Sequence, residues 1–206
     1  DRVKLIQDSA HSLGATYKGK LIGSLDSDFT IFSFQAIKHM TTGDGGLLAC
    51  KDEKDLIRGR KLRWFGIDRG RPGRTWNDDL EEIGYKFQMN DIAASIGIHQ
   101  LDELEDTISR RQEIAAQYNN ELKKVKIQQT SGYRCISSYW LYTIFVEDID
   151  PFMHSMQKNG IVSFPVHIRN DHYTGFKKFV HSSDDLKNVN EISKRMCCIP
   201  VGEWLK

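Results

Sequence analysis

Long apolar runs, an excess of charge of one sign and zinc-type cysteine spacings are all missing from this 206-residue chain. No stretch approaches the ~18 consecutive apolar residues that a membrane-spanning helix needs. A formal net charge of +1 gives little electrostatic attraction to nucleic acid or to anionic lipid. The first residues do not have the charged-then-apolar pattern of a signal segment. We therefore expect a cytoplasmic protein whose partners include neither nucleic acid nor a membrane.

The cysteines are few, and their spacing excludes the common metal sites. They are Cys50, Cys135, Cys197 and Cys198. No pair has the two-to-four-residue separation of a zinc ligand pair, and adjacent cysteines rarely bond each other. Free cysteine is among the residues most often buried in protein cores. We expect reduced, buried thiols and no metal.

The composition, with 39% apolar and 28% charged residues, is that of a globular protein large enough for a sizeable core. Apolar patterning predicts strands at residues 3–7, 29–34, 47–50, 140–146 and 161–164, and helices at 52–64, 90–122 (with a bend), 151–159 and 186–196. The expected caps are Asp52, Asn90 or Asp91, and Gly160; residues 13–20 are an expected loop or turn, and residues 68–79 an expected loop. The succession of strand, helix, strand and helix after Lys126 predicts a small α/β domain at 126–206, following a first domain at 1–125.

Lys38 has the most informative surroundings in the chain. The apolar runs at 29–34 and 47–50 flank it, and the glycine-rich turn 43–46 follows it. Two strand-like runs with such a turn between them predict a hairpin, or two adjacent strands, with Lys38 at the apex. Taken alone, a lysine in a turn is usually a solvated charge.

Three polar residues accompany this lysine. The expected strand at 3–7 leads directly to Asp8, and His11 follows three residues later. Ser33 lies near the end of the next strand, five residues before Lys38. An acid at a strand end, a histidine, a serine and a lysine in this order indicate a cofactor-binding amine. Taken singly, Asp8 could equally cap a turn after its strand.

Several blocks of the sequence resemble one enzyme family. They are Ile6–Ala15, Phe32–Gly46 and Gly84–Ala94, with weaker similarity from Ser138 to Val201. Together they resemble the DegT/DnrJ/EryC1/StrS family of sugar aminotransferases, which use pyridoxal phosphate. The resemblance implies an α/β fold of the aspartate-aminotransferase type (the type I pyridoxal-phosphate fold). It also implies that the chain corresponds to the second half to three-fifths of a member, with residues missing at both ends. Residues 1–125 would then be part of the large cofactor-binding domain with a bridging helix.

The same resemblance implies catalytic roles for Lys38 and Asp8. Lys38 would bond pyridoxal phosphate through its ε-amine, because a primary amine forms a reversible Schiff base, and would then carry protons. Asp8 would pair with the protonated pyridine nitrogen, which keeps the ring cationic and a better electron sink.

Further cofactor contacts follow from the resemblance. His11 would touch the ring or stack near it, and Ser33 would donate to the phosphate. Lys86 or Gln88 would reach a phosphate across a homodimer interface, although many members carry asparagine where this chain has Lys86. The arginine-rich loop at 68–79 could bind a carboxylate or a diphosphate, or could be a solvated surface. The polar segment 167–172 could face the substrate.

The function implied is transamination of a nucleotide-linked keto-sugar, with glutamate as amino donor. Three alternatives stay open. A related sugar dehydratase would carry histidine in place of the Schiff-base lysine, and His39 lies beside Lys38. A truncated, non-catalytic homologue could serve as a scaffold or partner. A protein of a different class could bind a small anion at residues 43–46.

Overall fold

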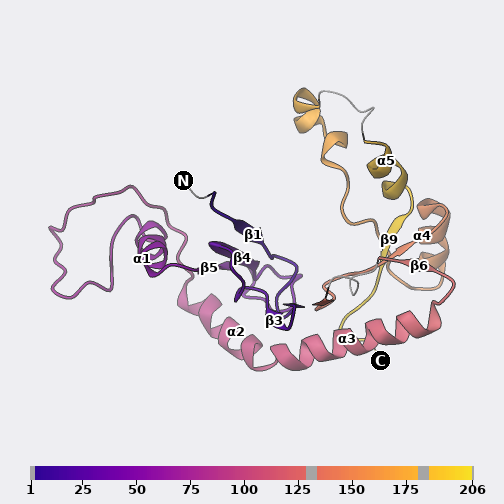
Figure 1. The fold of residues 1–206 in the computed structure, drawn as a ribbon, viewed down its shortest axis with the longest axis horizontal. Helices are drawn as coiled ribbons and strands as arrows, with labels where there is room; N and C mark the ends of the chain where they lie inside the picture. Colours follow the sequence, from indigo (N-terminus) through magenta and orange to yellow (C-terminus); the bar gives the residue numbers. More distant parts are fainter. Residues whose placement is uncertain (1–2, 129–133, 181–185, 206) are drawn as a thin grey trace. The chain divides into compact units, whose positions relative to one another are not determined.

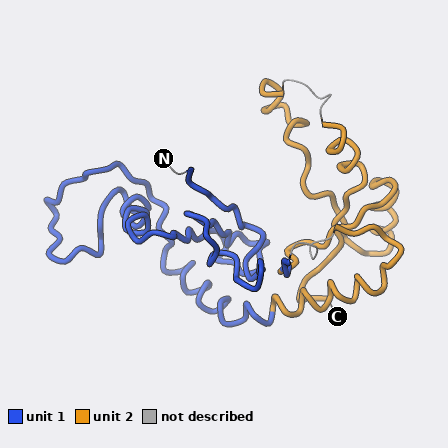
Figure 2. Tube along the Cα trace, in the orientation of Figure 1, with its two compact units in different colours: residues 1–106, 134–137 blue, residues 107–133, 138–206 orange. Residues whose placement is uncertain are grey.

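The computed structural model describes residues 3–128, 134–180 and 186–205 (Figure 1). It divides into two compact units (Figure 2). Unit 1 comprises residues 1–106 with 134–137, and unit 2 comprises residues 107–133 with 138–206. The domain boundary expected near residue 125 stays a prediction, because compactness alone does not define a domain.

The main sheet of unit 1 has the strand order β1-β4-β5. Its strands are β1 (Ile6–Asp8), β4 (Phe29–Ser33) and β5 (Gly46–Cys50). β1 runs parallel to β4, and β5 runs antiparallel to β4. The two adjacent strands predicted around Lys38 are therefore confirmed. The first strand is later and shorter than predicted, and it is not buried, since Ile6 is 61% exposed.

A second small sheet of unit 1 was not predicted. Its order is β3-β2-β7, from β2 (Thr16–Tyr17), β3 (Lys20–Leu21) and β7 (Cys135–Ile136). The loop or turn expected at 13–20 contains a turn at residues 18–19, but the two short strands that this turn joins into a tight hairpin, β2 and β3, were missed. Both of its turn residues, Lys18 and Gly19, have positive φ values of 51° and 76°. Such turns match the twist of paired strands, but lysine is not a usual residue for them.

The helices that lie wholly or partly in unit 1 occur where the apolar pattern predicts helices. They are α1 (Glu53–Leu62), α2 (Asp91–Asp102) and the beginning of α3 (Leu104–Glu121). The Asn90 side chain accepts a hydrogen bond of 2.9 Å from the Ala93 amide, which confirms it as N-cap. Asp52 occupies the N-cap position of α1, but its side chain makes no capping bond. The expected bend is a break at Glu103, the C-cap of α2.

Unit 2 is built on an antiparallel sheet of order β6-β8-β9. Its strands are β6 (Lys126–Ile127), β8 (Tyr142–Phe145) and β9 (Met196–Ile199). The remaining elements are α4 (Ile149–Lys158), α5 (Lys187–Ser193) and the 3-10 helices η2 (Asn170–His172) and η3 (Thr174–Phe179). Gly160 follows α4 with φ of 73°, which confirms the predicted C-terminal cap.

Two predicted elements of unit 2 are wrong. The expected strand at 161–164 is reduced to one bridge, between Phe164 and Cys198. The expected helix at 186–196 ends at Ser193, and β9 follows it. A four-residue apolar run such as Met196–Ile199 fits a buried strand as well as a helix end, so periodicity could not decide between them.

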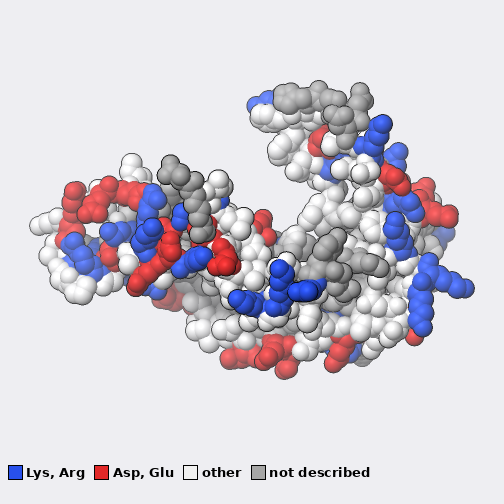
Figure 3. Space-filling view, in the orientation of Figure 1, with Lys and Arg blue, Asp and Glu red and all other residues white. Residues whose placement is uncertain are grey.

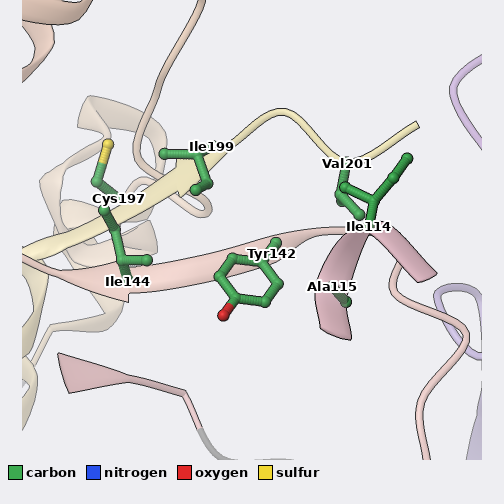
Figure 4. Close-up of a cluster of buried hydrophobic side chains, with 7 residues drawn as sticks. All are labelled: Ile114, Ala115, Tyr142, Ile144, Cys197, Ile199 and Val201. Carbon is green, nitrogen blue, oxygen red and sulfur yellow. The ribbon is translucent and has the colours of Figure 1, made fainter. Parts of the chain in front are cut away.

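The core of unit 2 joins α3 to β8 and β9 (Figure 4). Its buried members are Ile114, Ala115, Tyr142, Ile144, Cys197, Ile199 and Val201. Arg111 of α3 is also buried, at 4% exposure, and its Nη1 donates a hydrogen bond of 2.7 Å to the carbonyl oxygen of Val201. The Tyr118 hydroxyl donates a bond of 2.9 Å to the carbonyl oxygen of Pro200. These two polar contacts hold the segment after β9 against α3.

The cysteines are free thiols, and their burial is uneven. Cys197 and Cys198 are buried on β9, where burial raises the pKa of both thiols, whereas Cys50 and Cys135 are half-buried. Within the described ranges, no group of three or more histidine, cysteine or acidic side chains is placed to hold a metal ion. Across the same residues, no helix combines the length and the apolarity that crossing a bilayer requires.

Candidate functional site

Asp8 and Ser33 end neighbouring parallel strands of the main sheet. Asp8 is the last residue of β1 and pairs with Ile31 of β4, while Ser33 is the last residue of β4. Since β1 and β4 run in the same direction, their carboxyl ends meet at one edge of the sheet. The connection at 34–45, which carries Lys38, leaves from this same edge and returns to it in β5.

Lys38 is half-buried in this connection, and Asp8 acts on it electrostatically. Burial lowers the pKa of the Lys38 amine, because desolvation disfavours its charged form, and the negative charge of Asp8 opposes that lowering. The fold thus brings the acid that ends β1 and the lysine of the next connection into one local environment. A lysine with a lowered pKa has a larger fraction of neutral, nucleophilic amine near neutral pH.

The base of the Lys38 connection is closed by backbone hydrogen bonds. The Phe34 amide donates a hydrogen bond of 2.9 Å to the carbonyl oxygen of Gly45. The Thr42 amide donates one of 2.9 Å to the carbonyl oxygen of Phe34. Gly45 has φ of 145°, and a Cβ there would lie 2.7 Å from Oγ1 of Thr42. At Gly46, a Cβ would lie 2.6 Å from the carbonyl oxygen of Phe32. Close packing therefore requires glycine at position 45, against Thr42 of the same turn, and at position 46, against the neighbouring strand.

The other residues predicted at this edge have local contacts. One carboxylate oxygen of Asp8 accepts a bond of 3.1 Å from the Ala10 amide, so Asp8 also caps the turn that follows β1. The Ser33 hydroxyl oxygen accepts a bond of 3.3 Å from the Gln35 amide. His11 lies exposed in the turn after β1. Asp8 and Ser33 thus combine a structural contact with a position at the edge that Lys38 shares.

Lys86 belongs to a different cluster of unit 1. Its backbone pairs with that of Trp64, and its Nζ lies 4.1 Å from the centroid of the Trp64 ring. Nζ also lies 3.5 Å from Oε1 of Gln88, and the guanidinium of Arg69 lies 4.7 Å from the same ring. Trp64 as the centre of this cluster was not predicted. The signal available was a tryptophan beside an arginine-rich loop, since cations often stack on aromatic rings.

A cavity of about 500 Å³ lies beside α1, and none of its lining residues was predicted as a site residue. Basic side chains of α1 line one wall, and Glu81 and Glu82 line another. Arg58 pairs with Glu82, and Lys61 lies 3.6 Å from Glu81, so these charges neutralise one another. On the face drawn in Figure 3, basic and acidic side chains are likewise interspersed.

The sequence profile of the DegT/DnrJ/EryC1/StrS aminotransferase family matches residues 1–206, and the chain belongs to this family. An uncharacterized protein of Methanocaldococcus jannaschii is 36% identical over 215 residues, which cover 96% of this chain and 54% of the relative. The UDP-4-amino-4,6-dideoxy-N-acetyl-beta-L-altrosamine transaminase of Campylobacter jejuni serotype O:23/36 is 30% identical, covering 96% of this chain and 53% of the relative. The chain thus spans about half the length of these curated relatives.

Solved structures of sugar aminotransferases share the fold. CalS13 from Micromonospora echinospora superposes with a TM-score of 0.89 at 32% identity, over 100% of this chain and 55% of that one. Spr1654 from Streptococcus pneumoniae, a putative sugar aminotransferase in its PLP form, gives a TM-score of 0.86 at 27% identity, over 98% of this chain and 53% of that one. The expectation of a type I pyridoxal-phosphate fold is confirmed, and pyridoxal phosphate is the cofactor of the family.

Proposed function

We propose that this chain carries the lysine-bearing part of a pyridoxal-phosphate-dependent aminotransferase that transfers an amino group, with glutamate as donor, to a nucleotide-linked keto-sugar. We propose further that the enzyme is a cytoplasmic homodimer. The observation that carries the proposal is the placement of Asp8 and the half-buried Lys38 at one edge of the main sheet. The family membership and the sugar aminotransferases among its relatives support the same reaction class.

The groups at this edge fit the chemistry of pyridoxal phosphate, which presents an aldehyde, a pyridine ring and a phosphate. Lys38 offers a partly desolvated primary amine for the aldehyde. Asp8 offers a carboxylate for the pyridine nitrogen, and Ser33 offers a hydroxyl for the phosphate. We assign His11 to the face or rim of the ring. When bound, the cofactor supplies an electron sink for the substrate carbon.

The residues of the chain divide the remaining tasks. Lys38 would hold the cofactor through Nζ, and its free amine would accept and return a proton at the same atom. Asp8 holds a proton on the pyridine nitrogen by charge pairing. Ser33 orients the phosphate by hydrogen bonding. Lys86, or Gln88 beside it, contacts a phosphate in the neighbouring subunit, where a lysine acts as a point charge.

The alternatives differ in features that can be measured. A dehydratase of this family would need histidine at the lysine position, so Lys38 favours transamination. A non-catalytic homologue would form no amino-sugar product even with the cofactor bound. A simple anion-binding protein would form no covalent adduct at Lys38.

The decisive experiment is amino transfer by the full chain, supplied with pyridoxal phosphate, glutamate and a panel of nucleotide-linked keto-sugars. Mass spectrometry should find an amino-sugar product with one member of the panel and 2-oxoglutarate in equal amount. Dehydrated sugar without 2-oxoglutarate would indicate the dehydratase. No product with any sugar, despite bound cofactor, would favour the non-catalytic alternative.

Replacing Asp8 by asparagine should make Lys38 react at lower pH. The Asp8 charge raises the pKa of the Lys38 amine, so its removal leaves desolvation unopposed and lowers that pKa further. Acetylation of Lys38 by acetic anhydride, followed by mass spectrometry across a pH series without cofactor, measures the shift. Asp26→Asn, at an exposed ion pair with Lys51, is the matched control and should leave the midpoint unchanged. An equal midpoint in Asp8→Asn and the wild type would remove Asp8 from the environment of Lys38.

Mixing two inactive variants should restore part of the activity if Lys86 acts across the dimer. A Lys38→Ala subunit paired with a Lys86→Ala subunit forms one site in which both residues are intact. Random exchange of subunits then restores about a quarter of wild-type activity, because half of the dimers are mixed and each holds one intact site. The measurement is the transaminase rate after unfolding and refolding the variants together. Activity equal to that of the separately refolded variants would argue against a shared site.

A further inference from the structure

The hydrogen bonds at the base of the Lys38 connection do not by themselves fix its middle. The backbone bonds of Phe34, Thr42 and Gly45 join its two ends. Within it, the Lys38 amide donates to the carbonyl oxygen of Gln35 at 2.9 Å, which forms a single local turn. A connection of this length needs contacts with another element to hold one residue in place.

Helix α2 supplies such a contact. Oε1 of Gln100 accepts a hydrogen bond of 3.3 Å from the backbone amide of Thr41, which is 59 positions away in sequence. The hydroxyl of Thr41 donates to the carbonyl oxygen of Phe34 at 3.2 Å and accepts from the Gly43 amide at 2.9 Å. Thr41 therefore joins both ends of the connection, and Gln100 joins Thr41 to the helix.

Gly97 brings the helix close enough for this bond. It lies three residues before Gln100, on the same face of α2. A Cβ at Gly97 would lie 2.9 Å from Cγ2 of Thr42 and 3.9 Å from Cε of Met40. Thr42 and Met40 are both buried, at 5% and 6% exposure. The absence of a side chain at Gly97 thus leaves room for Thr42, while the side chain of Gln100 accepts the hydrogen bond from the Thr41 amide.

We propose that Gln100 is a positioning residue for Lys38, which fixes the lysine-bearing connection against α2 through the amide of Thr41. From residue 39 to residue 42 the chain is buried or bonded to α2, and Lys38 is the residue directly before this anchored stretch. Holding residues 39–42 in place therefore also holds the backbone from which the Lys38 side chain extends. The inference rests on the proposed function only for the chemistry assigned to the Lys38 amine.

Three variants of the full chain test this role. Gln100→Leu removes the side-chain oxygen that accepts from Thr41. Gln100→Asn keeps an amide oxygen on a side chain that is one methylene shorter. Gln100→Glu keeps an oxygen acceptor on a side chain of the same length. Gln117→Leu, at an exposed position of α3, repeats the first substitution elsewhere and is the control. If Gln100→Leu fails to fold, the milder Gln100→Asn carries the same test.

The first readouts need no cofactor. Hydrogen exchange of the Thr41 amide should be about five- to tenfold faster in Gln100→Leu and Gln100→Asn, and restored in Gln100→Glu. The pH midpoint of Lys38 acetylation should rise in the first two variants, because a looser connection exposes the amine to water and reduces its desolvation. A merely structural role would change the urea midpoint of unfolding without changing the midpoint of acetylation.

The second readout uses the enzyme supplied with cofactor. We expect kcat to fall about 10- to 100-fold in Gln100→Leu with KM for the sugar unchanged, because misplacing a reacting group is costly and the role proposed for Gln100 is a contact with Thr41 rather than with substrate. Unchanged Thr41 exchange in both acceptor-deficient variants would overturn the proposal. Faster exchange with unchanged Lys38 acetylation would also overturn it. If the enzyme binds no pyridoxal phosphate at all, the proposed function fails, and the exchange and acetylation results still decide the role of Gln100.

Discussion

Lys38→Ala is expected to abolish covalent binding of pyridoxal phosphate and to lower the transamination rate by at least about 10²- to 10⁴-fold, the range for loss of a positioned proton carrier. In the proposed mechanism, Lys38 supplies both the primary amine that bonds the cofactor and the atom that accepts a proton from substrate. It is half-buried with a lowered pKa, and alanine replaces neither function. The measurement is the visible absorbance of the bound cofactor, together with the amino-transfer rate of the full chain.

Two controls separate this effect from damage to the fold. Lys38→Arg keeps a positive charge but offers no amine that forms a Schiff base, so it should also lose the absorbance band. Lys54→Ala removes a lysine from the exposed surface of α1, and there the band should be retained. A band of wild-type intensity in Lys38→Ala would show that another group bonds the cofactor, and the proposed mechanism would be wrong.

Arg111→Ala is expected to destabilise the protein by about 2–4 kcal/mol, the range for losing charge-assisted hydrogen bonds to carbonyl groups, since its carboxylate partner Glu203 is half-exposed and stays solvated. Nη1 donates to the carbonyl oxygen of Val201 at 2.7 Å and to that of Tyr139 at 3.4 Å, and Nη2 pairs with Glu203 at 3.1 Å. Nη1 also lies 3.5 Å from the carbonyl oxygen of Trp140, so alanine would leave a cavity and three carbonyl groups without this donor. Burial already lowers the pKa of the Arg111 guanidinium, and the carboxylate of Glu203 opposes that lowering.

The free energy of unfolding in urea measures this effect. Arg110→Ala is the comparison on the same helix, because its guanidinium is partly exposed, pairs with Glu113 at 3.2 Å and makes one bond to a carbonyl oxygen, that of Leu205, at 2.9 Å. We expect a loss of about 1–2 kcal/mol there, from a surface ion pair and a single hydrogen bond. Equal losses in the two variants would mean that the buried bonds of Arg111 contribute no more than a surface contact.

Local signals predicted those parts of the fold that depend on neighbouring residues. The side-chain cap at Asn90, the glycine after α4 and the two strands around Lys38 all follow from short patterns. The β2–β3 hairpin was missed because Lys18 adopts a left-handed conformation that its side chain does not favour. β9 was missed because its four-residue apolar run has no period that distinguishes a strand from the end of the preceding helix.

The candidate site shows the same division. A strand-end acid and a lysine after the next strand could be predicted, since parallel strands bring their carboxyl ends together. The role of Gln100 could not be predicted, because nothing in the sequence around a helical glutamine indicates that it accepts a hydrogen bond from the distant Thr41 amide. Arg111 was also missed, since an arginine in a charged helical stretch is usually solvated, and its burial depends on residues 90 positions away.

The reversal of direction between β4 and β5 has an evolutionary consequence. If β5 were parallel to β4, the chain would have to cross from one edge of the sheet to the opposite edge before β5 could pair with β4. Such crossover connections usually contain a helix. Because β5 is antiparallel to β4, the whole connection at 34–45 stays at the edge of the sheet where β1 ends. Because Lys38 directly precedes the anchored stretch 39–42, an insertion or deletion in the connection would displace the amine relative to Asp8 even with the sheet unchanged.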